Sequence, residues 1–218
     1  MAALNPASYP PTDHWKSFRT GDFSSLGILF ETHYKELFYY GIKIVAMPEL
    51  VKDTIQDLFI DVWERRKNMV SVENIKAYLI ISLRRELIRQ VTEVRKKEHS
   101  NDQPETLQFS FSPEDFLISS EYNREHSQML SKSMADLTDR QREVILLRFF
   151  HGLEFTEISQ VLGMNVQSVR NLLFRSLDKI RKDMSSQGIN CVETVEVFLW
   201  TLFRKKTDRI LPTFNLIN

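Results

Sequence analysis

The stretch from residue 137 to residue 182, LTDRQREVILLRFFHGLEFTEISQVLGMNVQSVRNLLFRSLDKIRK, places the tightest limit on what this chain can form. Two short patterns with helical spacing flank Gly163, a residue suited to the left-handed turn that ends a helix. The first pattern begins near Thr156, with Glu157 in its first turn, and Asn165 can cap the second. Two short helices joined in this way predict a helix-turn-helix, whose second helix enters the DNA major groove.

The second helix has two different faces. At 100° per residue its apolar residues form one stripe, which consists of Val166, Val169, Leu173, Leu177 and Ile180. Away from that stripe lie the candidate DNA-reading residues Gln167, Arg170, Asn171, Phe174, Arg175 and Lys179. Arg170 suits guanine, Asn171 suits adenine and Phe174 suits a thymine methyl group, whereas cations such as Arg175 suit phosphates. The alternative is a solvated helical hairpin, and the large aromatic Phe174 outside the apolar stripe argues against it.

Most of the remaining chain is also helical in pattern. Six Gly and seven Pro in 218 residues favour long helices over many short strands. We therefore expect an all-α protein with two small helical domains, a polar linker and a C-terminal helical extension. The expected boundaries are a flexible N-terminal tail at 1–19, an N-terminal domain at 20–97, a linker at 98–124, a helix-turn-helix domain at 125–184 and an extension at 185–218.

Composition excludes several classes of protein. Lys and Arg balance Asp and Glu at 29 each, so only local clustering can point to a nucleic acid. Cys191 is alone and the five His show no metal spacing with it, so we expect no cofactor or metal. No apolar run reaches the roughly 20 residues of a membrane helix, and no signal peptide is recognisable, which predicts a cytoplasmic protein. Without a phosphate-binding loop or a nucleophile pair, we expect no enzyme.

The helix expected over residues 51–65 carries an acidic stripe. Val51, Ile55, Leu58, Phe59 and Val62 form its inward face. Asp53, Asp57, Asp61 and Glu64 form the acidic stripe, with Gln56 beside it. Carboxylates on one helix face repel each other unless a basic surface faces them, so this stripe is either a docking face for a basic partner or a solubilising face.

The next long helix, expected over about residues 75–97, carries cations instead. Tyr78, Ser82, Arg85, Arg89, Thr92 and Lys96 line one side, and leucines and valines line the other. An aromatic ring followed at helical spacing by cations suits single-stranded nucleic acid, because the ring stacks on bases and the charges contact phosphates. A core-edge Tyr with surface cations is the alternative for this helix taken alone.

These segments together resemble a protein family. VKDTIQDLFIDVWERR at 51–66 resembles the polymerase-docking segment of bacterial sigma factors of the extracytoplasmic-function (ECF) group, with Asp53, Gln56, Phe59 and Trp63 in register. IKAYLIISLRRELIRQ resembles the segment that melts and reads the −10 promoter element. The stretch 137–181 resembles the region that reads the −35 element.

The resemblance implies partners and residue roles. The partners are core RNA polymerase, through the clamp helices of its largest subunit and its flap region, and promoter DNA as duplex and as melted single strand. The implied polymerase-binding residues are Asp53, Gln56, Asp57, Phe59, Asp61 and Trp63. The implied −10 residues are Tyr78, Arg85, Arg89 and Lys96, and the −35 residues are the six DNA-reading residues of the second helix-turn-helix helix. Arg85 replaces a usual Asn, which favours contacts with the DNA backbone.

Two alternatives stay open at this point. The first is a polymerase-independent helix-turn-helix regulator, for which the acidic stripe would have no use. The second concerns the extension, whose apolar residues Val192, Val195, Phe198, Leu199, Leu202 and Phe203 are expected to pack on the C-terminal domain. They could instead dock an anti-sigma factor or a DNA-targeting recruiter such as an RNA-guided protein.

Overall fold

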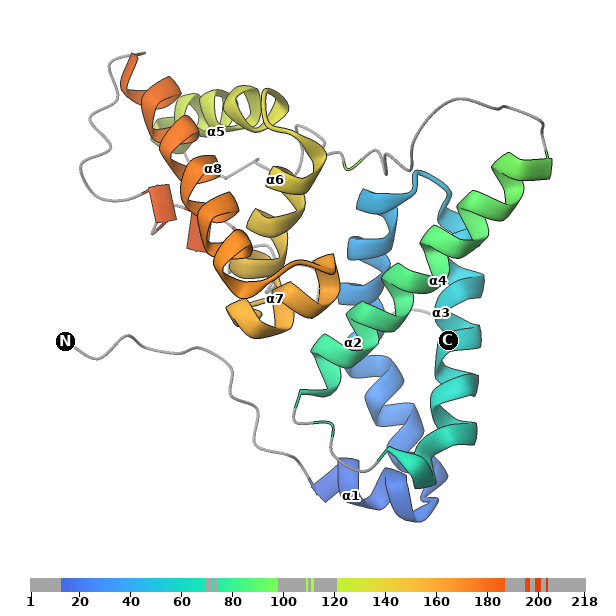
Figure 1. Cartoon of the computed structure of the whole chain (residues 1–218). Coiled ribbons are helices and arrows are strands. Elements are labelled where there is room, and N and C mark those ends of the chain that lie inside the picture. The colour runs from blue at the N-terminus through green and yellow to red at the C-terminus, as the bar shows by residue number, and fades with distance from the viewer. Residues whose placement is uncertain are drawn as a thin grey trace. The chain divides into compact units, whose positions relative to one another are not determined.

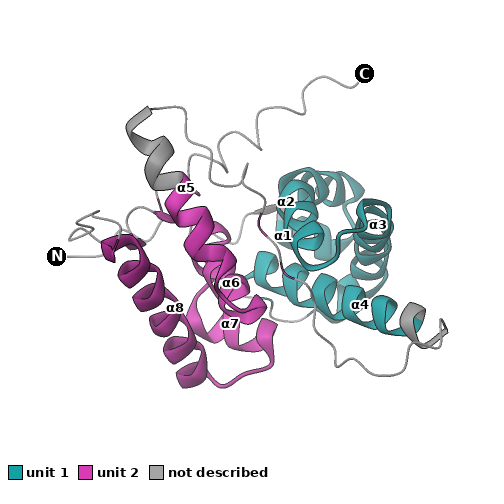
Figure 2. Cartoon of the chain, turned by 90° about the horizontal axis from the view of Figure 1, so that it is seen from above, with its two compact units in different colours: residues 1–107 teal, residues 108–218 magenta. Residues whose placement is uncertain are grey.

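The structure, a computed structural model, describes residues 13–69, 74–97 and 121–186, together with Val72, Phe109, Phe111, Val195, Glu196, Leu199, Trp200 and Phe203. The chain divides into two compact units, residues 1–107 and residues 108–218 (Figure 2). Every regular element within the described ranges is helical, which confirms the all-α prediction. Within those ranges no helix combines the length and apolar character needed to cross a membrane.

The first unit is a helical bundle. Its helices are α1 (Asp13–Thr20), α2 (Phe23–Ile44), α3 (Pro48–Arg65), the short 3-10 turn η1 (Arg66–Asn68) and α4 (Ile75–Lys97). In Figure 1, α2, α3 and α4 lie side by side, and α1 packs at the end of α2 beside η1. Asp22 caps α2 by accepting a hydrogen bond from Ser24 N at 3.1 Å, and Pro48 occupies the first turn of α3.

A close contact between α2 and α3 fixes the centre of this bundle. Gly41 and Val51 are buried, and a methyl group added at Gly41 would lie 2.5 Å from Val51 Cγ1. The glycine therefore lets the two helices approach where no side chain would fit. Around this contact the core consists of fully buried side chains from the three long helices: Leu37, Tyr40, Ile44, Ile55, Leu79, Ile80, Leu83 and Leu87.

Helix α1 shows that the expected flexible tail over residues 1–19 is wrong for residues 13–19. Residues 1–12 lie outside the described residues. Phe18 is fully buried, and Trp15 stacks on it with ring centroids 5.2 Å apart. The Phe18 ring also lies 5.7 Å from the Trp63 ring at the end of α3. An eight-residue helix gives only a short periodic signal, so its two buried aromatics become interpretable only with their tertiary partner.

The regular elements that the structure describes in the second unit are helical. They are α5 (Glu121–Ala135), α6 (Asp139–Ile145), the π-helical turn η3 (Leu146–Phe150), α7 (Phe155–Leu162) and α8 (Val166–Ser186). Helix α6 opens with a reciprocal cap, in which Gln141 N donates to Thr138 Oγ1 and Thr138 N donates to Gln141 Oε1. Helix α8 packs against α5, α6 and α7. Since α5 begins at Glu121, the expected end of the linker at residue 124 is too late.

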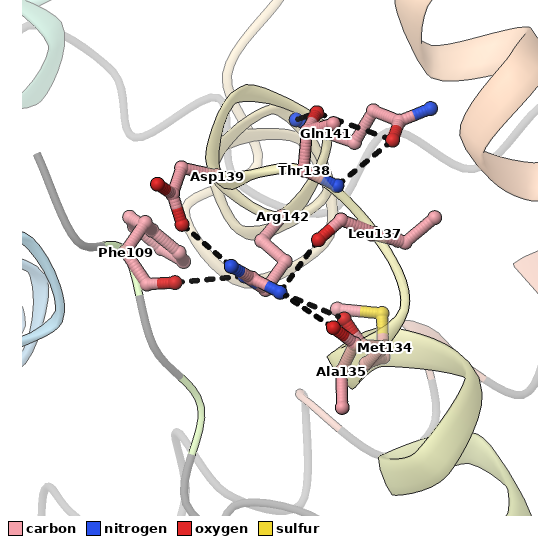
Figure 3. A network of polar contacts seen from close by, with 8 residues as sticks. All are labelled: Phe109, Met134, Ala135, Leu137, Thr138, Asp139, Gln141 and Arg142. Carbon is pink, nitrogen blue, oxygen red and sulfur yellow. Dashed lines mark hydrogen bonds and ion pairs between the residues drawn. The ribbon is translucent and has the colours of Figure 1, made fainter. Parts of the chain in front are cut away.

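Arg142 organises the start of α6 (Figure 3). Its guanidinium donates to the carbonyl oxygens of Met134, Ala135 and Leu137 at 3.3, 3.0 and 2.6 Å. These carbonyls belong to the end of α5 and the turn that follows it, where helices leave acceptors unsatisfied. The same side chain pairs with Asp139 and donates to Phe109 O at 2.7 Å. Arg142 thus satisfies carbonyl oxygens at the end of α5, pairs with Asp139 in the first turn of α6 and binds Phe109 of the expected linker.

The C-terminal extension packs on this unit through the residues that the structure describes. Val195, Leu199 and Phe203 are almost fully buried, and the Trp200 ring lies 5.5 Å from the Phe149 ring of η3. The expectation that the extension packs on the C-terminal domain is confirmed for Phe203, whose ring lies 5.9 Å from the Phe150 ring of η3. Side chains of Val192, Phe198 and Leu202, named in the same expectation, lie outside the described residues.

Candidate functional site

The helix-turn-helix forms with the predicted caps. Helix α7 begins at Phe155, where Glu154 N donates to Glu157 Oε2 at 2.7 Å. Gly163 ends α7 in the left-handed conformation, with φ 64° and ψ 36°, a conformation that glycine adopts without steric cost. Asn165 Oδ1 then accepts a hydrogen bond from Ser168 N at 2.7 Å and caps α8. The turn between the two helices is therefore fixed by its backbone geometry and by its cap.

The predicted stripe of α8 faces the core of the unit. Val169, Leu173, Leu177 and Ile180 are buried, and Val166 at the helix start is half-buried. The side chains of Gln167, Arg170, Asn171, Phe174 and Arg175 are exposed. Phe174 has 68% of its surface exposed and lies outside the buried stripe of α8. A large exposed ring among polar residues marks a surface that awaits a partner.

Local contacts orient part of this face. Gln167 Nε2 donates to Asn171 Oδ1 at 3.1 Å, one helical turn away. The Arg170 guanidinium lies 5.4 Å from the centre of the Phe155 ring of α7, within the range of a cation–π contact. Lys179 differs from the others, because its ammonium donates to the backbone oxygen of Asp136 and its side chain is half-buried. Lys179 thus serves the α5–α8 contact, and a DNA contact would compete with that bond.

The acidic stripe lies on the exposed side of α3. Asp53, Gln56, Asp57 and Glu64 are exposed, and Asp61 is half-buried and pairs with Arg65 at 2.6 Å. Ile60 lies among these acids with 58% of its surface exposed. Sequence interpretation missed Ile60, although an isoleucine outside the inward register of α3 was a usable signal. The result is an acidic face with an apolar centre, which is the composition of a protein-docking surface with a hydrophobic anchor.

Two other residues of the expected polymerase-binding set point into the unit. Phe59 is only 5% exposed, and its ring meets the Phe30 ring of α2 edge-on at 5.0 Å. Trp63 is half-buried between the rings of Phe18 and Phe23. The Arg66 guanidinium stacks on the Trp63 indole at 4.1 Å. Phe59 and Trp63 therefore hold α3 on α2 and α1, and Phe59 offers no surface to a partner.

Carboxylates of α4 itself neutralise part of the charge on its cationic side. Tyr78 is half-buried and Arg85 is exposed. Arg89 lies between two carboxylates, with its Nε 3.0 Å from Glu86 Oε2 and its Nη1 2.6 Å from Glu93 Oε1. The hydrogen bonds from Arg89 lower the pKa of the Glu86 carboxyl. The side chain of Lys96 lies outside the described residues. Of the other expected −10 residues, Tyr78 and Arg85 are at least partly accessible and are not held between two carboxylates as Arg89 is.

Comparisons with known proteins agree with this geometry. The family described as sigma-70, region 4 matches residues 127–180, which contain the helix-turn-helix. RNA polymerase sigma factor YlaC of Bacillus subtilis (strain 168) is 25% identical over 169 residues, covering 74% of this chain and 92% of that protein. RNA polymerase sigma factor SigO of the same organism is 32% identical over 76 residues, which are 34% of this chain and 43% of that protein.

A solved structure shares the fold. It is the sigma factor RpoE in complex with the anti-sigma factor NepR from Bartonella quintana, with a TM-score of 0.52 and 18% identity over 75% of this chain and 97% of that chain. The region 4 match lies on the helix-turn-helix, and the similarity to YlaC extends over both helical units. Residues 127–180 therefore match sigma-70 region 4, and the chain is similar over most of its length to an RNA polymerase sigma factor.

Proposed function

We propose that this protein binds core RNA polymerase through α3 and directs promoter-specific initiation, with α8 in the major groove of the −35 element and α4 on the melted −10 strand. The exposed row of polar and aromatic side chains on α8, within the segment that matches sigma-70 region 4, is the observation that carries the proposal. The protein acts by binding, without catalysis of its own, and acts in the cytoplasm, where the polymerase is.

Helix α8 supplies the sequence-specific contact. Arg170 and Asn171 present the side-chain types that bind guanine and adenine edges in pairs of hydrogen bonds, each worth about 1–3 kcal/mol of discrimination. The contact of Arg170 with the Phe155 ring restrains its guanidinium, which reduces the entropy lost on binding. Phe174 adds an apolar surface for a thymine methyl group, and Arg175 suits a phosphate.

Promoter titration tests this assignment. Arg170→Ala should weaken binding to the cognate −35 sequence by roughly tenfold or more and leave binding to sequences altered at the contacted base almost unchanged. The matched control is Arg140→Ala, because Arg140 is an exposed arginine of α6 in the same unit, outside α8. An equal loss on all DNA sequences would show that Arg170 contacts only the backbone.

Helix α3 supplies the polymerase contact. The acids around Ile60 favour a basic partner surface, as the clamp helices of the largest subunit are expected to offer. Charge pairs steer the encounter, whereas a desolvated apolar anchor supplies much of the binding free energy. We therefore assign Asp53, Gln56, Asp57, Asp61 and Ile60 to direct contact, and give Phe59 and Trp63 the task of supporting α3 from inside.

Co-purification with core polymerase tests the docking surface. The pair Asp53→Lys and Gln56→Ala should abolish co-purification and promoter-dependent transcription, and Ile60→Ala should weaken both. Glu31→Lys is the matched control, because Glu31 is an exposed acid on α2 of the same unit. If the wild-type protein failed to bind core polymerase, yet bound duplex DNA through α8, it would be a polymerase-independent regulator instead.

Helix α4 supplies the contact with melted DNA. Tyr78 can stack on an unpaired base and Arg85 can contact a phosphate, whereas Arg89 must first leave Glu86 and Glu93. Arg85→Ala should therefore reduce open-complex formation more than Arg89→Ala, as measured by permanganate reactivity of the melted strand. A larger effect of Arg89→Ala would show that its two carboxylate partners release it in the complex.

The structural relative crystallised with an anti-sigma factor suggests a further partner of that class for this chain. The described apolar residues of the extension do not suit that role, because Val195, Leu199 and Phe203 are already buried in the chain itself. The same burial leaves them unavailable to a DNA-targeting recruiter.

A further inference from the structure

The expected linker and the C-terminal extension meet within the second unit. The Phe203 ring of the extension lies 5.9 Å from the Phe150 ring of η3 and 6.2 Å from the Phe111 ring of the linker. The Phe111 ring in turn lies 5.4 Å from that of Phe109. We call these four rings, Phe109, Phe111, Phe150 and Phe203, the aromatic clasp. Segments almost a hundred residues apart in the sequence thereby share one packed cluster.

A polar contact fastens the linker at the same place. Phe109 is only 2% exposed, and its carbonyl oxygen accepts the 2.7 Å hydrogen bond from Arg142 Nε (Figure 3). Hydrogen bonds from a charged donor are stronger than neutral ones, and this donor is held by three further carbonyls and by Asp139. Backbone and side chain of Phe109 are therefore both bound to the second unit.

This attachment shortens the chain that connects the two units. Twelve residue steps separate Lys97, the end of α4, from Phe109, whereas 24 steps separate Lys97 from Glu121, the start of α5. Because each step spans at most about 3.6 Å, the covalent reach is about 43 Å with Phe109 fastened and about 86 Å with it released. Fastening Phe109 thus halves the greatest distance that the connection can span.

We propose that the C-terminal extension acts, through the aromatic clasp, as a fastener that sets the length of the tether between the two units. The fully buried Phe203 contacts both Phe111 and Phe150, so the extension and the linker stabilise each other on η3. Only the effect on promoter binding rests on the proposed function. A protein that contacts one promoter through both α4 and α8 can make the two contacts together only when its tether spans the distance between them.

Hydrogen exchange on the free full-length chain tests the clasp. Phe203→Ala should speed amide exchange at residues 109–111 by about tenfold, which corresponds to about 1.4 kcal/mol of local opening. Binding of the two segments is reciprocal, so Phe111→Ala should speed exchange at residues 199–203 by a similar factor. Phe174→Ala, which removes an exposed ring of the same unit, is the control and should change neither segment.

Exchange in α8 shows whether the unit stays folded in each variant. If Phe203→Ala unfolds the unit, Phe111→Ala still tests the clasp from the linker side, where the ring is half-buried. Unchanged exchange at 199–203 in Phe111→Ala would overturn the proposal.

A distance measurement tests the tether directly. Spin labels at Glu31→Cys and Ser185→Cys, both exposed positions, report the separation of the units in a Cys191→Ser background. Opening the clasp with Phe111→Ala should extend the distribution toward longer separations, and an unchanged distribution would refute the tether role. Because neither assay contains polymerase or DNA, their outcome is independent of whether the proposed sigma activity is correct.

Discussion

The contact of Gly41 with Val51 leads to a prediction in which one substitution has opposite effects in two backgrounds. In Gly41→Ala the new methyl group would lie 2.5 Å from Val51 Cγ1 and 3.2 Å from Val51 Cγ2. Non-bonded carbon atoms rest about 3.5–4.0 Å apart, so α2 and α3 would have to separate by about 1 Å or distort. Both residues are buried, so the added volume has no route to solvent.

The magnitude follows from two opposing terms. Overpacking a core costs about 1–3 kcal/mol, and replacing Gly by Ala inside a helix returns up to about 1 kcal/mol. Gly41→Ala should therefore destabilise the wild-type protein by about 1 kcal/mol. Val51→Ala alone should cost about 2 kcal/mol, because it removes two buried methyl groups and leaves a cavity. In that background the clashing atoms are absent, and Gly41→Ala should stabilise by about 1 kcal/mol.

Urea unfolding followed by tryptophan fluorescence measures this cycle. Two of the three tryptophans, Trp15 and Trp63, lie in the first unit, so a Trp200→Phe background restricts the signal to that unit. Equal effects of Gly41→Ala in both backgrounds would refute the close approach, since independent sites are additive. Because α3 carries the acidic stripe, polymerase binding should fall in Gly41→Ala and recover in the double variant.

Three further predictions concern other contacts. Burial, with a smaller contribution from Lys76, lowers the pKa of His33 to about 4. Between about pH 6.5 and 4 the unfolded chain therefore binds a proton at His33 that the folded chain does not. The free energy of unfolding should fall as the pH falls through this window. His33→Gln should flatten the dependence of the urea midpoint on pH. Gly163→Ala should cost about 1 kcal/mol in thermal unfolding and Gly163→Asn less, because asparagine tolerates a positive φ better; equal losses would contradict this explanation. Arg142→Lys should lower the stability of the second unit by about 2–3 kcal/mol, since an ammonium cannot reach all of the acceptors that the guanidinium fork joins, and an unchanged urea midpoint would show that Arg142 is dispensable.

The sequence predicted elements whose signals are local. The helix-turn-helix was recognisable because Glu157, Gly163 and Asn165 each satisfy a backbone requirement at a fixed offset, and all three occupy the expected positions. The inward face of α3 was recognisable because its apolar residues follow one period, and Val51, Ile55, Leu58, Phe59 and Val62 are all buried.

Features that depend on distant partners were not predictable in the same way. Phe109 lay in a polar stretch, and its burial depends on Arg142 and on the extension. Lys179 carried the same charge as its neighbours on α8, and only the nearby end of α5 distinguishes it. Arg89 looked like a DNA-binding cation until the rotamers of Glu86 and Glu93 placed a carboxylate on each side of it. Residue type and spacing do not determine which of several partners a long side chain selects.

The π-helical turn η3 has a consequence for how this protein can change in length. His151 N donates to Leu146 O at 3.1 Å, five residues earlier, so this turn contains one residue more than an α-helical turn. Because this wider turn already absorbs the extra residue, deleting one residue of η3 would restore regular α-helical winding and leave the helices that follow close to their present orientation relative to α6. Deleting one residue from a regular α-helical turn of α6 would instead rotate everything after it by about 100°. Single-residue differences in length are therefore expected to be tolerated better within η3 than in the α-helical turns beside it.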